Sequence, residues 1–281
     1  MGQLVTRRSF VALLMLSGLA IGQPALAQNG RSVKTYIALG DSIAFGETDV
    51  LFPSFGDQGY VGLYADFLAT QFDGKRPNIV NLGIVGETST SFFTGVVQTW
   101  WGRVAMANLN YDNPGAIQFN KFLEVVQAEK AARHQIKVVS FALGGDDVIA
   151  LSFSPAWNAP GADQLALLEE LFAEMESNYV RFLTALRTEL PHTKVLLLNY
   201  YNAFDFLPPD DPTNLLLTIA LQRHDAMVQQ LSAEFKAHRV DVYSAFQGHA
   251  LEYTFIGVGN IHPNALGYSV IAQEMINASE N

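Results

Sequence analysis

Short apolar runs of β-type residues alternate with longer segments of helical periodicity along most of this chain. Polar or glycine-rich residues follow each of five such runs, at 35–39, 78–82, 136–143, 194–200 and 239–243. The spacing of apolar residues predicts helices at 59–72, 118–133, 162–189, 213–238 and 264–278. Because strands separated by helices form parallel sheets covered on both faces, the pattern predicts an α/β protein. We expect one three-layer αβα sandwich around a mostly parallel five-stranded sheet.

Composition narrows the classes of function. The chain has 281 residues, of which 49% are hydrophobic, so it can bury a substantial core. Its formal net charge is -10, and Lys and Arg do not cluster outside the N-terminus. This balance argues against nucleic acid and anionic membrane surfaces as partners. Cysteine is absent, which excludes disulfides, a thiol nucleophile and thiolate metal sites.

The first 27 residues have the features of an export signal. Arg7 and Arg8 precede an apolar run at 11–22, and Ala25-Leu26-Ala27 offers the small-x-small pattern of a cleavage site. The paired arginines resemble a twin-arginine signal. The apolar run is too short for a bilayer core of about 30 Å, so we expect no stable membrane anchor. We therefore predict a signal peptide at 1–27, one folded domain at 28–281, and a secreted or periplasmic protein of bacterial type.

Two short motifs lie at opposite ends of the αβ pattern. The first predicted strand runs directly into Gly40-Asp41-Ser42, and His262 stands just before the last predicted helix. A glycine turn at the carboxyl end of a parallel strand would present the Ser42 hydroxyl where open α/β sheets place their sites. A serine hydroxyl needs a base to become a nucleophile, and His262 is the candidate. The pair indicates nucleophilic serine chemistry.

Four sequence blocks, in order and in register with the predicted strands, resemble the SGNH, or GDSL, family of hydrolases. They are Gly40-Asp41-Ser42-Ile43, then Asn81-Leu82-Gly83 with Gly86-Glu87-Thr88, then Gly144-Gly145-Asp146-Asp147, then His262-Pro263-Asn264. The resemblance covers essentially the whole chain after the export signal. It implies a flavodoxin-like fold and an esterase, lipase or deacylase that uses no metal or cofactor.

The resemblance also implies roles for individual residues. Ser42 would be the nucleophile and His262 its base. The family binds the tetrahedral oxyanion with the backbone N–H groups of the serine and of the second-block glycine, and with an asparagine amide. The two backbone donors correspond to Ser42 and Gly86. The third position is Asp146 in this chain, which departs from the family pattern.

The departure at Asp146 leaves two interpretations open. An ionised carboxylate would repel an oxyanion, and losing one donor typically costs ~10²–10³ in rate. A protonated Asp146 can still donate, because an apolar site can keep a carboxylic acid neutral at pH 7. Alternatively, Asp146 turns away and satisfies loop amides.

A second departure concerns the group that orients the histidine. The family places an aspartate three residues before it, and that position is Gly259 here. The imidazole Nδ1–H needs only an acceptor, so a backbone carbonyl near Gly259 or the side chain of Glu252 can serve. The working hypothesis is a Ser-His dyad.

Asp41 and Asp147 have the simpler interpretation that they hold strand-end loops through backbone hydrogen bonds. A Mg²⁺ site made of these two residues and Asp146 is the less favoured alternative, because carboxylates at neighbouring strand ends can converge. We therefore expect no metal site.

Aromatic residues suggest the class of substrate. A long segment at 91–115 contains Phe92, Phe93, Trp100 and Trp101, and long connections with apolar groups are often binding loops. Further aromatics follow other predicted strands: Phe153, Trp157, Phe204, Phe206, Tyr253 and Phe255. Any one of them can instead complete the core. The sequence thus predicts an exported serine hydrolase that cleaves small-molecule, lipid or glycan esters through an acyl-enzyme. The alternative is a non-enzymatic acyl- or glycan-binding relative.

Overall fold

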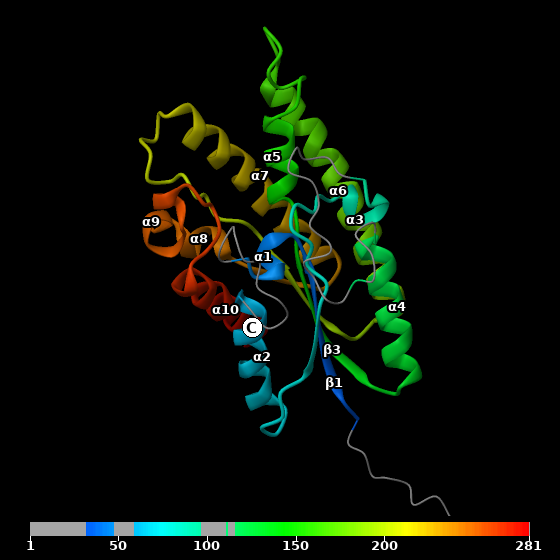
Figure 1. Cartoon of the computed structure of the whole chain (residues 1–281). Helices are drawn as coiled ribbons and strands as arrows, with labels where there is room; N and C mark the ends of the chain where they lie inside the picture. Colours follow the sequence, from blue (N-terminus) through cyan, green and yellow to red (C-terminus); the bar gives the residue numbers. More distant parts are fainter. Residues whose placement is uncertain (1–31, 48–58, 97–110, 112–115, 281) are drawn as a thin grey trace, which may run out of the picture. The chain divides into compact units, whose positions relative to one another are not determined.

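A five-stranded parallel sheet forms the centre of the computed structural model, which describes residues 32–47, 59–96, 111 and 116–280 (Figure 1). The sheet order is β2-β1-β3-β4-β5, and every neighbouring pair is parallel. The strands are β1 (Lys34–Gly40), β2 (Asn78–Asn81), β3 (Gln135–Ala142), β4 (Lys194–Leu198) and β5 (His238–Val240). The predicted five-stranded αβα sandwich is confirmed, and the strand order is that of flavodoxin-like folds.

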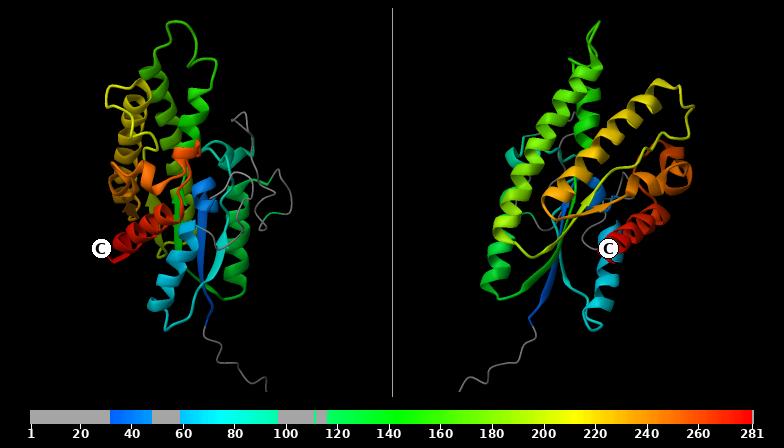
Figure 2. Two further views of the ribbon diagram at one scale, coloured as in Figure 1. Left: turned by 60° about the vertical axis from the view of Figure 1, so that its left-hand side comes forward. Right: turned by 180° about the vertical axis from the view of Figure 1, so that it is seen from behind.

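Long helices cover the two faces of the sheet. One face packs against α4 (Gln118–Ala131), α6 (Gln164–Glu189) and α7 (Pro212–Glu234). The other packs against α2 (Gly59–Gln71) and α10 (Ala265–Glu280), which lie side by side in both orientations of the ribbon (Figure 2). These are the five helices predicted from periodicity.

Alternation along β1 explains why both faces are buried. Ile37 and Leu39 belong to one apolar cluster, whereas Tyr36 and Ala38 belong to the other. Successive side chains of a strand point to opposite faces, so a continuous apolar run supplies both cores.

Within the described ranges, six short elements were not predicted. They are α1 (Ser42–Phe45), α3 (Ser91–Thr94), α5 (Gly145–Ser152), α8 (Val242–Phe246), α9 (Ala250–Tyr253) and the 3₁₀ turn η2 (Ile256–Val258). One of them corrects a prediction: the strand expected at 239–243 ends at Val240. The Asp241 side chain accepts a hydrogen bond from the Ser244 N–H, which begins α8 and stops the strand.

The fold places two loops side by side at the carboxyl edge of the sheet. β1 and β3 are neighbours, and they lead into α1 and α5 respectively. The chain passes from β1 to β2 on one side and then returns to β3 on the other, which makes this a topological switch point. Such points are where open α/β sheets bind ligands.

The predicted signal peptide and the boundary between residues 27 and 28 lie outside the described residues, so both stay predictions. Among the helices that the structure describes, none has both the length and the apolar character needed to cross a bilayer.

Candidate active site

Ser42 stands at the sharp turn between β1 and α1. Gly40 has φ +142°, and a Cβ there would lie 2.0 Å from the Ala142 carbonyl oxygen of the neighbouring strand. Only glycine fits this approach. Next to it, the Asp41 carboxylate accepts a hydrogen bond from the Ile43 N–H (2.9 Å), as the interpretation of Asp41 as a loop-holding residue predicted. The turn presents Ser42 as the first residue of α1, almost buried.

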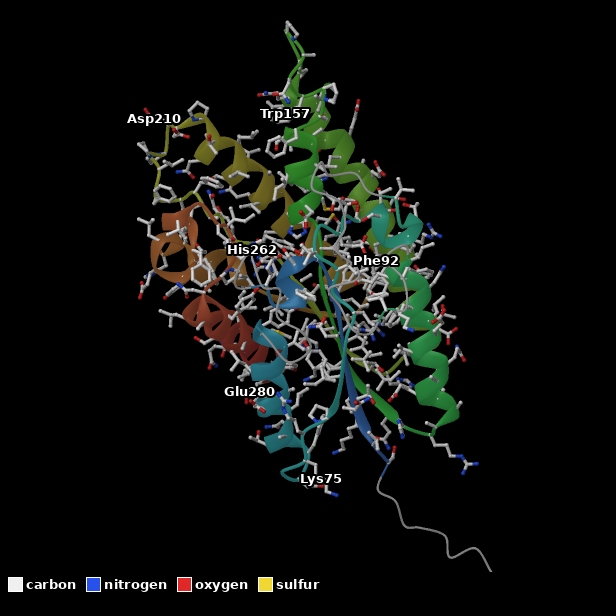
Figure 3. The ribbon with its side chains drawn as sticks, in the orientation of Figure 1. Lys75, Phe92, Trp157, Asp210, His262 and Glu280 are labelled. Carbon is white, nitrogen blue, oxygen red and sulfur yellow. The ribbon has the colours of Figure 1, made fainter. Side chains whose placement is uncertain are left out.

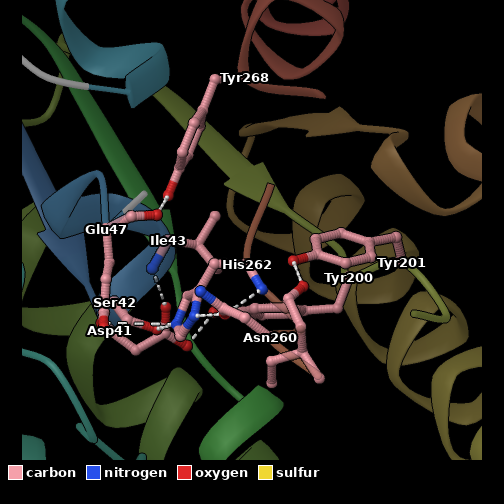
Figure 4. A network of polar contacts seen from close by, with 10 residues as sticks. Asp41, Ser42, Ile43, Glu47, Tyr200, Tyr201, Asn260, His262 and Tyr268 are labelled. Atoms are coloured by element: carbon pink, nitrogen blue, oxygen red, sulfur yellow. Dashed lines mark hydrogen bonds and ion pairs between the residues drawn. The ribbon is translucent and has the colours of Figure 1, made fainter. Parts of the chain in front are cut away.

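His262 reaches Ser42 from the loop before α10, although 220 positions separate the two residues in sequence. The imidazole Nε2 lies 2.8 Å from the Ser42 Oγ (Figure 4). Figure 3 shows His262 beside α1 in the context of the whole chain. Burial lowers the pKa of His262 to about 4, so the ring is neutral at pH 7 and can accept a proton. The geometry is that of a nucleophile and its base.

Asn260 orients the imidazole. Its Oδ1 lies 2.6 Å from the Nδ1 of His262 and also accepts a hydrogen bond from the His262 backbone N–H at 3.0 Å. An amide oxygen can only accept, so Nδ1 carries the hydrogen and Nε2 is free to accept from Ser42. The sequence offered a signal for this residue, since Asn often bonds to the backbone two residues on.

The sequence-based expectation for this acceptor was wrong. The Glu252 carboxylate lies 2.9 Å from Nδ1 of His249, and not at His262. The carbonyl expected near Gly259 is replaced by the Asn260 side chain. Gly259 itself ends η2 with φ +82°, a left-handed conformation that glycine adopts readily. The missing aspartate is thus replaced by a neutral amide one residue later in the chain.

Gly86 lies in the loop after β2, with φ +77°. Asn81, at the end of β2, ties this loop to the serine turn: its side-chain amide donates to the Ala44 carbonyl at 2.8 Å, and its Oδ1 accepts from the Gly83 N–H at 2.9 Å. The second sequence block is thereby attached to the helix that begins with Ser42.

Asp146 lies in the first turn of α5 and is buried, with 7% of its surface exposed. Burial, together with the charges of Asp41, Asp147, Glu47 and Glu87, raises the pKa of Asp146 well above its usual value. The raised pKa favours the protonated carboxyl group, which can donate a hydrogen bond.

The other interpretation of Asp146, as an anchor for loop amides, applies to its neighbour Asp147. The Asp147 carboxylate accepts hydrogen bonds from the Ser89 N–H (2.9 Å) and hydroxyl (2.6 Å), which fastens α5 to the loop after β2. Asp146 accepts no such bond from the residues that the structure describes.

Two further residues hold the serine turn and were not found from the sequence. The Gln118 side chain accepts from the Gly40 N–H at 2.7 Å and donates to the Gly40 carbonyl at 2.9 Å. The Tyr200 hydroxyl donates to the second oxygen of Asp41. Burial raises the pKa of Asp41 to about 7, against the opposing effect of the Tyr200 hydrogen bond. No sequence motif marks Gln118 or Tyr200, because they meet the turn only in the folded chain.

Glu47 is a third unpredicted neighbour. Its Oε2 lies 3.5 Å from Nε2 of His262, and burial raises the pKa of this carboxyl to about 7.

Within the described residues, no group of three or more His, Asp or Glu side chains is arranged to hold a metal ion. Asp41 and Asp147, two members of the alternative Mg²⁺ site, are hydrogen-bonded to protein donors.

The aromatic residues divide between core and surface. Phe92 and Trp157 are buried in the apolar core, whereas Phe153 is 62% exposed and Phe206 is 44% exposed. Trp100 and Trp101 lie outside the described residues. The core interpretation therefore holds for Phe92 and Trp157.

Solved structures of known hydrolases share this fold. The lipase Lip_vut3 from a goat rumen metagenome is 18% identical, with a TM-score of 0.61 over 88% of this chain and 97% of that chain. LAE5, an alpha/beta hydrolase enzyme from the metagenome of Lake Arreo, Spain, is 19% identical, with a TM-score of 0.55 over 89% and 96%. Axe2, an acetylxylan esterase from Geobacillus stearothermophilus, is 17% identical, with a TM-score of 0.53 over 88% and 94%. At these identities the likeness shows the fold.

No curated protein shows a significant match to the sequence. A family profile does match: it is described as the GDSL-like Lipase/Acylhydrolase family, and it spans residues 38–270. The match contains all four blocks that suggested the resemblance. Because it covers most of the chain, this protein belongs to the GDSL-like lipase/acylhydrolase family.

Proposed function

We propose that this protein hydrolyses carboxylic esters with Ser42 as nucleophile and His262 as base. The observation that carries the proposal is the chain of contacts from Ser42 Oγ to His262 Nε2 (2.8 Å) and from Nδ1 to Asn260 Oδ1 (2.6 Å). Membership of an acylhydrolase family supports the same chemistry.

In the acylation step, Ser42 Oγ attacks the acyl carbon of the ester while its proton passes to Nε2 of His262. Asn260 keeps the hydrogen on Nδ1, so Nε2 faces the serine throughout. The imidazolium then gives its proton to the leaving alcohol, and an acyl-enzyme remains. Water attacks this ester in the second half of the cycle, with His262 again as base.

We assign the tetrahedral oxyanion to three donors from three separate segments of the chain. They are the backbone N–H of Ser42, the backbone N–H of Gly86 and the neutral carboxyl of Asp146. The buried position of Asp146 and the carboxylates around it keep its proton in place. Donors aimed at the developing charge are usually the largest single contribution to such a reaction.

The substrate is an ester of a small molecule, a lipid or a glycan. Exposed Phe153 and Phe206 support an apolar acyl group. Lip_vut3 is described as a lipase and Axe2 as an acetylxylan esterase, so long acyl chains and acetylated sugars define the two ends of a useful substrate panel.

The direct test is hydrolysis of p-nitrophenyl esters of increasing chain length by the wild type and the Ser42→Ala variant. We expect turnover in the wild type and none above background in the variant, with an unchanged melting temperature. Ser269→Ala removes an exposed hydroxyl in α10 and serves as the matched control. Equal turnover by wild type and Ser42→Ala would remove Ser42 from the mechanism.

The rival proposal is a non-enzymatic acyl- or glycan-binding relative. The two departures that suggested it, at Gly259 and Asp146, have chemical substitutes in Asn260 and in a neutral acid. Saturable binding of an acyl ester without turnover in the wild type would favour the binder.

We also propose export through the segment at 1–27. The paired arginines, the apolar run and the cleavage pattern support it. N-terminal sequencing of protein recovered from the periplasm or medium should begin at Gln28, and Arg7→Lys with Arg8→Lys should retain the uncleaved chain in the cytoplasm.

A further inference from the structure

The backbone of Glu47 is held close to the serine turn. Its N–H donates to the Ser42 carbonyl at 3.0 Å, and its carbonyl accepts from the Tyr268 hydroxyl at 2.7 Å. Only 8% of the residue is exposed. The backbone N–H and the backbone carbonyl of Glu47 are therefore both fixed, which restricts the direction of its side chain.

The side chain points toward the reacting atoms. Glu47 Oε2 lies 3.5 Å from His262 Nε2. The close view draws the side chain of Glu47 pointing toward His262 (Figure 4). Glu47 Oε2 is buried and has no hydrogen-bond partner among the residues that the structure describes. A buried carboxyl oxygen without a hydrogen-bond partner lowers the stability of the folded protein. Its position therefore indicates a functional role.

The catalytic cycle lacks a negative charge that serine triads possess. The proton taken from Ser42 turns His262 into an imidazolium, and a triad aspartate stabilises that cation. Asn260 orients the ring but is neutral. Among the described residues, Glu47 is the carboxylate within ion-pair distance of the His262 ring.

We propose that Glu47 is a positioning residue for His262, and that its carboxylate supplies from the Nε2 side the charge that stabilises the imidazolium. This inference rests on the proposed ester hydrolysis. The proton moves from Ser42 Oγ to Nε2 and then to the leaving alcohol. On this route the charged form of Glu47 takes no proton, because Ser42 is the closer partner of Nε2, at 2.8 Å against 3.5 Å.

Two other titratable groups lie near Glu47. Burial and nearby charges, that of Glu47 among them, raise the pKa of Asp146, and the Tyr268 hydroxyl donates a hydrogen bond to the Glu47 carbonyl. The raised pKa of Asp146 favours its neutral form, which does not oppose ionisation of Glu47. Burial brings the pKa of Glu47 to about 7, so the charged form appears as the pH rises through neutrality. Hydrolysis should therefore increase across this range for a reason separate from deprotonation of His262.

The kinetic test compares the pH profile of kcat/KM for the wild type, Glu47→Gln and Glu47→Asp. An opposite charge at this distance typically shifts a pKa by about one unit or more, which corresponds to about tenfold in rate. We expect Glu47→Gln to lose about tenfold or more at pH 8 and to lack the rise near pH 7. Glu47→Asp keeps a charge and should keep the rise. An unchanged profile, or an equal loss at every pH, would overturn the inference.

A spectroscopic test detects the contact between Glu47 and His262 in the absence of substrate. The ¹⁵N signals of the His262 ring, assigned by their loss in His262→Gln, should show a second inflection near pH 7 in the wild type. This inflection should disappear in Glu47→Gln. A single inflection in the wild type would contradict the inference, even if the variants do not fold.

Glu252→Gln is the matched control. It removes one carboxylate from an exposed side chain that pairs with His249. We expect it to leave the His262 titration and the pH profile unchanged. If the NMR inflection is present but no ester is hydrolysed, the proposed function fails and the Glu47 contact stands. If esters are hydrolysed but Glu47→Gln has the wild-type profile, only the present inference fails.

Discussion

Asn260 does at Nδ1 of His262 what an aspartate does in a serine triad, except that it carries no charge. The 2.6 Å contact selects the tautomer and the direction of the ring. Orientation and charge are therefore separate properties at this site: Asn260 provides the first, and the nearby carboxyl of Glu47 is placed to provide the second. The two contributions can be measured independently by substitution.

Substitutions at Asn260 test the orienting role. Asn260→Ala leaves Nδ1–H without its acceptor, and we expect a fall in kcat of up to about 10⁴-fold, as when the orienting group of a triad is lost. Asn260→Asp keeps the acceptor and adds charge, so it should be at least as active as the wild type. Steady-state kinetics with one ester would measure kcat for both variants and the wild type. An equal loss of kcat in both variants would argue against the orienting role of Asn260.

Asp146 gives a second test. If it donates a hydrogen bond to the oxyanion as a neutral acid, Asp146→Asn keeps a donor and should preserve or increase kcat/KM. Asp146→Ala removes the donor and should reduce kcat/KM by about 10²–10³-fold. A loss in Asp146→Asn as large as that in Asp146→Ala would contradict the neutral-acid assignment.

Sequence reasoning reached some of these residues and missed others for a physical reason. Ser42 and His262 are marked by motifs at predicted element ends. Asn260 had a local signal, because its oxygen bonds to the backbone two residues on. Glu47 and Gln118 had none, since they meet the site only through the packing of α1 and α4 against distant segments.

The turn between β1 and α1 is the element on which the site depends. Gln118 of α4 bonds to both backbone groups of Gly40, and Asp41 caps α1. The same turn approaches β3 so closely that a side chain at Gly40 would overlap the Ala142 carbonyl. The position of Ser42 is thus set by three neighbouring segments, and it should respond to any change in the turn.

Gly40→Ala should be strongly destabilising, by more than about 3 kcal/mol, because it combines a backbone overlap with an unfavourable φ. Gly74→Ala is the matched control: φ is +75° there, but nothing lies within 4 Å of the new Cβ. Gly74→Ala should lower the free energy of unfolding by only about 1–2 kcal/mol. Thermal unfolding of both variants would measure the difference, and similar losses would show that the close approach to β3 is unimportant.

The long elements were predictable because periodicity needs length to be visible. A helix such as α6 shows its buried stripe over many turns, with Leu168, Phe172, Met175 and Tyr179 on one face. The short helices show no period. α8 begins where Asp241 caps it, within a stretch of apolar residues that looks like the end of a strand.

Across the whole molecule, the site concentrates buried acids in a chain that is already negatively charged. Burial raises the pKa of Asp41 and Glu47 to about 7, that of Asp147 to about 6, and that of Asp146 well above its usual value. Between about pH 4 and these raised pKa values, the four carboxyl groups are protonated in the folded state but ionised in the unfolded state. The stability that this provides is complete below about pH 4 and is lost as the pH rises through about 7.

Two buried histidines have the opposite effect. Burial lowers the pKa of His224 and of His262 to about 4, so the unfolded state takes up protons between about pH 6.5 and pH 4. Their contribution is present above pH 6.5 and is lost as the pH falls. Burial also lowers the pKa of half-buried His238. Four acids thus oppose three histidines, and the acids determine the direction of the change between pH 5 and pH 8.

We therefore expect the free energy of unfolding to fall from pH 5 to pH 8, by about 1.4 kcal/mol per pH unit for each proton released. Urea denaturation at several pH values would measure it. Glu47→Gln removes one titrating acid and should reduce the slope. A stability that rises with pH over this interval would show that the acids are ionised in the folded protein.

The central claim is that Ser42 is the nucleophile and that His262 activates it. Reaction with a fluorophosphonate probe, followed by peptide mapping by mass spectrometry, tests this most directly. We expect a single covalent adduct on Ser42 in the wild type and greatly slowed labelling in His262→Ala. No adduct on Ser42 at high probe concentration, or labelling that does not depend on His262, would contradict it.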